Sequence, residues 1–151
     1  MHSTETQTVL LSAVEVVLET ACCAGVFESR EQAPAAGGEA SITVLVSFDG
    51  RPSGEFSLHV PETVALQLAA GFLGLDDCDV SAAQAAEVAC ELANMICGAV
   101  LSNLCASATF HMSHPLLAQK EERGADCAAI CRWFDLGGGS LTACLRFREA
   151  L

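Results

Sequence analysis

The stretch of this chain best suited to chemistry is a line of polar residues within Ser81–Leu104. Residues three or four apart in a helix stack along one side, and that side would carry Glu87, Glu91, Asn94 and Gly98. A side-chain amide both donates and accepts hydrogen bonds, so it can hold a water molecule, while a carboxylate can pair with a lysine. An ordinary solvated helix face carries Lys or Arg, and this stretch contains neither.

The element that positions these groups is predicted to be one long helix. Ser81 followed by Gln84 is typical of a capping box, and the residues up to Leu104 include no proline and one glycine. Gly98 costs roughly 1 kcal/mol in a helix interior relative to Ala, and its missing side chain lets another surface come close. On the other side of the helix, apolar residues at helical spacing predict a stripe that faces the core: Ala85, Ala89, Leu92, Ala93, Ile96, Val100 and Leu104.

Glu91-Leu-Ala-Asn94 followed by Gly98 resembles the E-x-x-N-x-x-x-G signature of the CheC/CheX/FliY family of chemotaxis phosphatases. The string ELANMICGAVLSNL is close to the CheX version of that signature. As an order of elements, the resemblance covers most of the chain, from Thr8 to Phe147. It implies a single CheX-like domain over residues 1–151, a homodimer, and a phosphorylated CheY-like receiver as the partner.

By the same resemblance, Asn94 orients the water that attacks the aspartyl phosphate of the receiver, and Glu91 contacts the receiver's lysine. Such a hydrolysis gains from positioning, which a side chain on a rigid helix can supply. Glu87 and Gly98 are expected to support docking. We expect no cofactor of the protein's own, because Mg²⁺ would come with the receiver.

Composition argues against several classes of function. The formal net charge is −12 with only seven Lys and Arg, so nucleic acid is not an expected partner. A chain of 151 residues suffices for one domain with a core. No apolar run approaches the ~20 residues of a membrane helix, and MHSTETQTV lacks the basic start of a secretory signal. We therefore expect a cytoplasmic protein that does not insert into a membrane.

The remaining segments predict a mainly antiparallel sheet with helices packed on one face, which is an α+β fold. The first helix is predicted over Thr8–Ala24, stopping at Gly25, with Val9, Leu10, Ala13, Val16, Val17 and Thr20 facing inward. The other predicted elements are a loop over Glu28–Gly38, a hairpin of Ala40–Phe48 and Gly54–Val60, a helix from Pro61 to about Leu73, and strands over Ala106–Met112, Asp126–Leu136 and Leu141–Arg148.

The chain contains nine cysteines, which is a high count for its length. Because no secretion signal is visible, we expect most of them to be reduced residues in or near the core, without a disulfide framework. His111 and His114 with Cys127 and Cys131 are conceivable zinc ligands, but C-x-x-x-C on a strand is not a standard zinc spacing. We predict no metal site.

Two further readings of the function stay open. The same fold and dimer could bind a receiver or another signalling protein without hydrolysing anything, and Glu91 and Asn94 would then only face solvent or dock. A thiol or metal protein built on the cysteines is the weaker alternative. The first helix has Glu15 and Glu19 but no asparagine, so one E-x-x-N site is expected, as in the CheX-like branch.

Overall fold

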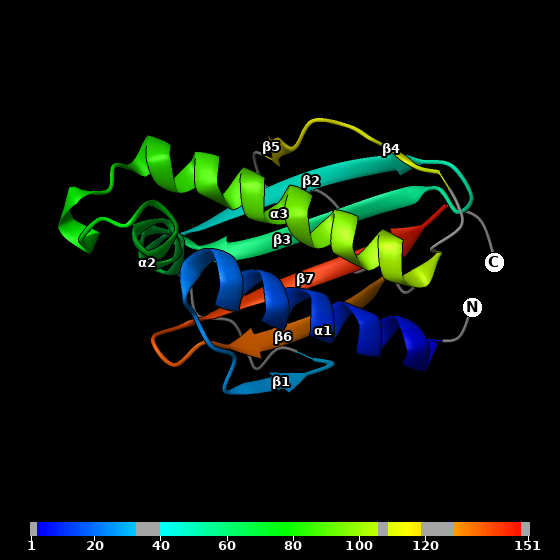
Figure 1. Cartoon of the computed structure of the whole chain (residues 1–151), viewed down its shortest axis with the longest axis horizontal. Coiled ribbons are helices and arrows are strands. Elements are labelled where there is room, and N and C mark those ends of the chain that lie inside the picture. The colour runs from blue at the N-terminus through cyan, green and yellow to red at the C-terminus, as the bar shows by residue number, and fades with distance from the viewer. Residues whose placement is uncertain (1–2, 33–39, 106–108, 119–128, 149–151) are drawn as a thin grey trace.

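In the part of the chain that the structure describes, three α-helices pack on one face of an antiparallel sheet (Figure 1), which confirms the predicted α+β fold. The computed structural model describes residues 3–32, 40–105, 109–118 and 129–148. The described sheet has seven strands in the order β1-β6-β7-β3-β2-β4, and β5 pairs with β2 on the same edge as β4. The elements are α1 Ser3–Cys22, β1 Glu28–Arg30, β2 Ser41–Asp49, β3 Gly54–Pro61, α2 Glu62–Leu73, a 3₁₀ turn Asp77–Asp79, α3 Ala82–Leu104, β4 His111–Met112, β5 Leu116–Ala118, β6 Ile130–Asp135 and β7 Ser140–Phe147.

The core lies between the helices and the sheet face that they cover. Period-two alternation puts one side of each central strand inward, and the buried side chains are Val44, Val46 and Phe48 of β2, Phe56, Leu58 and Val60 of β3, and Leu141, Ala143 and Leu145 of β7. The predicted hairpin is confirmed, with Ile42 paired to Val60 and Phe48 paired to Gly54. The turn at Gly137–Gly139 is likewise present between β6 and β7.

Helix α1 begins and ends earlier than predicted. Its second turn is tied to β6, because Gln7 donates to the Cys131 carbonyl oxygen at 3.3 Å and accepts from Arg132 at 3.1 Å. Its end falls at Cys22, since Cys23 takes a left-handed backbone conformation with φ of 56°. The predicted stop at Gly25 was therefore wrong.

The inward face of α1 is also rotated from the predicted one. Val16 is 56% exposed and Thr20 is exposed, whereas Val14 and Leu18 are fully buried. Leu10, Ala13 and Val17 are buried as predicted. The face that α1 buries is set by its contacts with α2, α3 and β6.

Several strand boundaries differ from those predicted. Part of the expected loop Glu28–Gly38 is strand β1, which pairs with β6, while residues 33–39 lie outside the described residues. Pro61 ends β3 and precedes α2, which starts at Glu62 and stops before the left-handed Gly74. Strand β5 was not predicted. Residues 106–108 and 126–128 of two predicted strands also lie outside the described part.

Two of the cysteines are joined, contrary to the expectation of reduced thiols at these positions. Cys131 of β6 and Cys144 of β7 are directly opposite one another and form a disulfide. Cys144 alternates with the buried Ala143 and Leu145, so this bond lies on the sheet face away from the helices. Within the described residues, the free cysteines are Cys22, Cys23, Cys78, Cys90, Cys97 and Cys105.

Candidate functional site

The predicted helix and its cap are both present. The Ser81 hydroxyl accepts from the Gln84 backbone N–H at 3.1 Å, and the Gln84 side-chain oxygen accepts from the Ser81 N–H at 2.9 Å. Every member of the predicted stripe is buried except Leu104, which is half-buried. Val88, Cys97 and Leu101 are buried as well. Helix α3 therefore packs against α1, α2 and the sheet, and this packing holds its remaining, accessible side in a fixed position.

Helix α3 is also the one described helix that is long and apolar enough to cross a membrane. Half of its most apolar stretch is buried inside the fold. Its packing accounts for that apolar character as the core helix of the helix-on-sheet arrangement.

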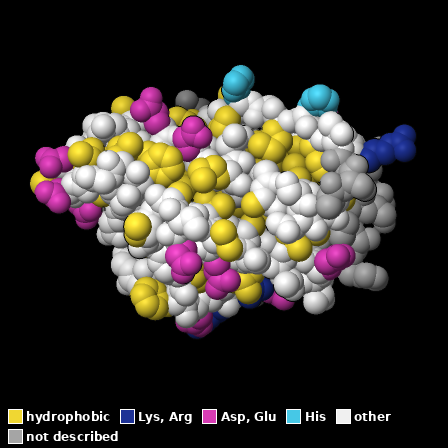
Figure 2. All heavy atoms as spheres, in the orientation of Figure 1, with side chains coloured by type: hydrophobic (Ala, Val, Ile, Leu, Met, Phe, Trp, Pro, Cys, Tyr) yellow, Lys and Arg dark blue, Asp and Glu magenta, His cyan; other side chains and the backbone are white. Residues whose placement is uncertain are grey.

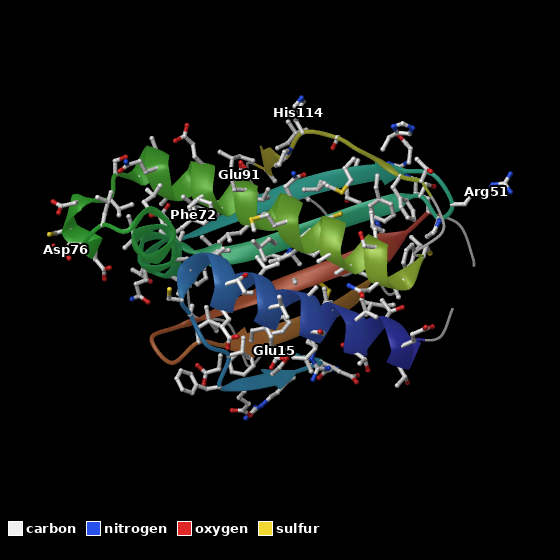
Figure 3. All side chains as sticks on the ribbon, in the orientation of Figure 1. Glu15, Arg51, Phe72, Asp76, Glu91 and His114 are labelled. Carbon is white, nitrogen blue, oxygen red and sulfur yellow. A yellow bond between two sulfur atoms is a disulfide. The ribbon has the colours of Figure 1, made fainter. Side chains whose placement is uncertain are left out.

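The polar line lies on the accessible side of α3. Glu87 and Glu91 are exposed, and Asn94 and Gly98 are half-buried. Figure 3 shows Glu91 projecting from α3 toward the side on which β5 lies. The four predicted site residues are thus brought together along one side of one helix.

Strand β4 flanks this line at Gly98. A β-carbon built at Gly98 would lie 4.0 Å from the Met112 side chain, which is ordinary van der Waals contact. The fold itself therefore does not require glycine at this position. The space that the glycine leaves is on the surface beside Asn94, and an approaching partner can use it.

Strand β5 lies on the same edge of β2 as β4 and also contacts α3. Met112 pairs with Phe48 and Leu117 pairs with Val44, four residues apart on β2, which is about 13 Å. Helix α3 and β5 are in contact, and β5 lies near the middle of α3 in the view of Figure 1. A strand ending at Met112 was predicted, but β5 and the pairing of both strands with β2 were not, because that register depends on contacts between distant segments.

The electrostatic character of the site is acidic. Figure 2 shows acidic and apolar side chains together over α3, and the Lys and Arg side chains of the described residues lie at the margins of this face. The half-buried Cys90 lies between Glu87 and Glu91 in the helix, and burial, followed by Glu91 and Glu87, raises its pKa. The thiol is therefore mostly protonated at neutral pH, which makes it a weak nucleophile.

The zinc alternative finds no support in the arrangement. Three strands separate His111 of β4 from Cys131 of β6, and the Cys131 sulfur is bonded to Cys144. Cys127 lies outside the described residues. No group of three or more His, Cys, Asp or Glu side chains in the described part of the chain is placed to hold a metal ion.

Fold and site together define a helix-on-sheet protein that presents a carboxylate and an amide, one turn apart, on an exposed side of its central helix. The family model described as chemotaxis phosphatase CheX matches residues 42–133, which include Glu91 and Asn94. The chain belongs to the CheX family.

Solved structures support the same fold. A putative chemotaxis protein from Desulfovibrio vulgaris Hildenborough is 18% identical with a TM-score of 0.76, and covers 95% of this chain and 97% of its own. CheX from Vibrio vulnificus is 19% identical with a TM-score of 0.75, and covers 95% of this chain and 99% of its own. A CheX–CheY–BeF₃–Mg²⁺ complex from Borrelia burgdorferi is 20% identical with a TM-score of 0.73, over 94% of this chain and 97% of that one. A comparison with curated proteins finds no match.

Proposed function

We propose that this protein is a phosphatase that hydrolyses the aspartyl phosphate of a CheY-like response regulator. The observation that carries the proposal is the placement of Glu91 and Asn94 on the accessible side of a capped, tightly packed helix. Both residues lie within the segment that matches the family of chemotaxis phosphatases. The Borrelia relative whose structure is a complex with CheY supports a receiver as the partner.

In the proposed reaction, a water oxygen attacks phosphorus as the bond between phosphorus and the aspartyl oxygen breaks. Inorganic phosphate leaves and the receiver recovers its free carboxylate. Asn94 orients that water through its carboxamide, which accepts one hydrogen bond and donates another. Its contribution is positioning, so no covalent intermediate on this protein is involved.

Glu91 would pair with the lysine of the receiver and fix the register in which Asn94 enters. Glu87 extends the negative charge along the same line, while Gly98 leaves room for the approach. Mg²⁺ belongs to the substrate in this scheme, since the receiver holds it. We also propose that the protein acts in the cytoplasm as a homodimer, which sedimentation would test as a mass of two chains.

The test is the loss of phosphoryl label from CheY-like receivers encoded in the same genome, with and without this protein. We expect acceleration over spontaneous decay, and a loss of about 100-fold or more in Asn94→Ala because a misplaced water forfeits the orientation. Asn103→Ala is the matched control. Asn103 is an exposed asparagine on the same helix, and its amide donates to the Ala99 carbonyl oxygen at 2.7 Å.

Glu91→Ala should weaken binding as well as turnover, because the lysine contact is lost. If no receiver loses label faster than by spontaneous decay, but receivers still bind, the protein is a non-catalytic interaction module. In that case Asn94→Ala and Asn103→Ala would behave alike.

A further inference from the structure

Two exposed apolar side chains border the Glu91–Asn94 line. The large hydrophobic residues exposed in the described part of the chain are Val16, Phe27, Leu73, Leu75, Met95, Leu116 and Leu117. Met95 is 39% exposed and follows Asn94 on α3, one turn after Glu91. Leu117 is 52% exposed on β5, which contacts α3. The polar pair is therefore flanked by apolar surface on α3 and on β5.

The direction of Leu117 follows from its register. Residues directly opposite in an antiparallel pair place their side chains on the same face, and Leu117 is opposite Val44, which is fully buried beneath the helices. Leu117 therefore points to the helix side of the sheet, toward α3. Its neighbour Leu116 is opposite Leu45, on the other face, and is 64% exposed.

We propose that Leu117 and Met95 form an apolar ledge on which the phosphorylated receiver docks when Asn94 enters its active site. This inference rests on the proposed function and extends it to the residues that set affinity. The occupant is argued from continuity, because a receiver that surrounds Glu91 and Asn94 must also cover the surface beside them. It is also argued from charge, since the acidic line between the apolar residues suits a partner that brings a lysine.

The composition of this surface fits an interface of that kind. Most of the binding energy of a protein interface comes from a few well-packed residues near its centre, where charged residues are depleted and aromatic residues and Met are enriched. Leu117 and Met95 supply the anchors, while Glu91 and Asn94 supply the orientation. Covering the exposed half of a leucine side chain corresponds to roughly a four- to tenfold change in Kd.

The experiment compares Leu117→Ser with Leu116→Ser, two neighbouring exposed leucines on opposite faces of one strand. Each CheY-like receiver from the same genome is held in its active form by beryllofluoride and Mg²⁺, and its Kd is measured by titration. We expect Leu117→Ser to weaken binding four- to tenfold, to raise KM for dephosphorylation by a similar factor, and to leave kcat unchanged. Leu116→Ser should match the unmodified protein, and Met95→Ala should shift Kd in the same direction as Leu117→Ser.

Equal Kd values for Leu117→Ser and Leu116→Ser, in a protein that accelerates dephosphorylation, would overturn the ledge and leave the proposed function standing. Weakened binding by Leu117→Ser in a protein with no turnover would support the ledge and overturn the phosphatase. Sedimentation of both variants provides a further check. If Leu117→Ser alone halves the mass, the ledge is an interface between two copies of this chain and the proposal is wrong.

Discussion

Gly98 of α3 and Met112 of β4 face one another across a gap that would accept one more carbon atom. A β-carbon at Gly98 would lie at an ordinary contact distance of 4.0 Å from both the sulfur and the terminal carbon of Met112. Glycine at this point of a helix interior thus costs stability without a requirement from the fold. Any role of Gly98 therefore lies in the interaction of the protein with another molecule.

Gly98→Ala should therefore stabilise the protein and impair its activity. We expect the free energy of unfolding in urea to rise by about 0.5–1 kcal/mol, and dephosphorylation to slow severalfold because the added methyl group narrows the approach to Asn94. Gly71→Ala is the control, since its β-carbon would collide with the Cys22 carbonyl oxygen. It should destabilise the fold. Unchanged activity in Gly98→Ala would show that the gap has no docking role.

Ser81→Ala removes the side-chain half of the capping box. The Gln84 N–H then loses its acceptor, so the free energy of unfolding should fall by about 1 kcal/mol. Ser102→Ala, at an exposed position near the other end of α3, should not destabilise the protein. Thermal and urea unfolding of the two variants provide the comparison, and equal stability would argue against a working cap.

The Cys131–Cys144 disulfide closes a loop over a sequence separation of 13 residues. In the chain-entropy description, such a loop contributes up to about 3 kcal/mol by restricting the unfolded chain. The double variant Cys131→Ser with Cys144→Ser should be less stable than the unmodified protein in oxidising buffer and equal to it in a thiol reductant. Cys78→Ser, at an exposed free cysteine, should behave alike in both buffers.

Stability should decrease in alkaline solution because of Cys97. Burial raises the pKa of this thiol from 9.0 to about 12, so above pH 9 the unfolded chain loses the proton that the folded protein retains. The unfolded state then binds fewer protons, and the free energy of unfolding falls as pH rises, by about 1.4 kcal/mol at pH 10 from this residue alone. Cys97→Ala should flatten that decline between pH 9 and 12 in urea titrations. An unchanged slope would contradict the burial argument.

The pKa and the alkylation rate of the Cys90 thiol are expected to depend on the negative charge of the site. Burial, followed by Glu91 and Glu87, raises its pKa, so Glu91→Gln should lower that pKa and speed alkylation at pH 8. The rate is measured by mass spectrometry of the Cys90 peptide, with the exposed Cys78 as the internal reference. Bound beryllofluoride-activated receiver should slow alkylation of Cys90 while leaving Cys78 unaffected. Equal protection of both thiols would point to a nonspecific effect.

The features of the fold that could be predicted from the sequence are those set by the spacing of residues close together in the chain. The cap at Ser81 and Gln84, the buried stripe of α3, and the alternation that builds the β2–β3 hairpin all follow from spacing within a short window. The location of Glu91 and Asn94 on one side of a helix follows in the same way. Both residues lie within the segment that the family model matches, residues 42–133.

The remaining features depend on contacts between distant segments. Strands β1 and β5 are three residues long and owe their conformation to pairing with β6 and β2. Val16 continues an apolar pattern yet is exposed, because neighbouring elements decide which face α1 buries. The partners Cys131 and Cys144 are defined only once β6 and β7 are in register. Such information is tertiary and is absent from any short window of sequence.

If the protein is the proposed phosphatase, the continuity of α3 between Glu91 and Asn94 affects which receivers it can dephosphorylate. The two positions are separated by three residues, or about 4.5 Å along the helix axis, and neither backbone position can shift without moving the other. The helix therefore holds the two positions at a fixed separation. A receiver would be dephosphorylated only when the distance between its lysine and its phosphoryl group matches that separation. A receiver with another spacing would bind without being dephosphorylated. Selection among receivers would then lie in their own internal dimensions as well as in how tightly they bind.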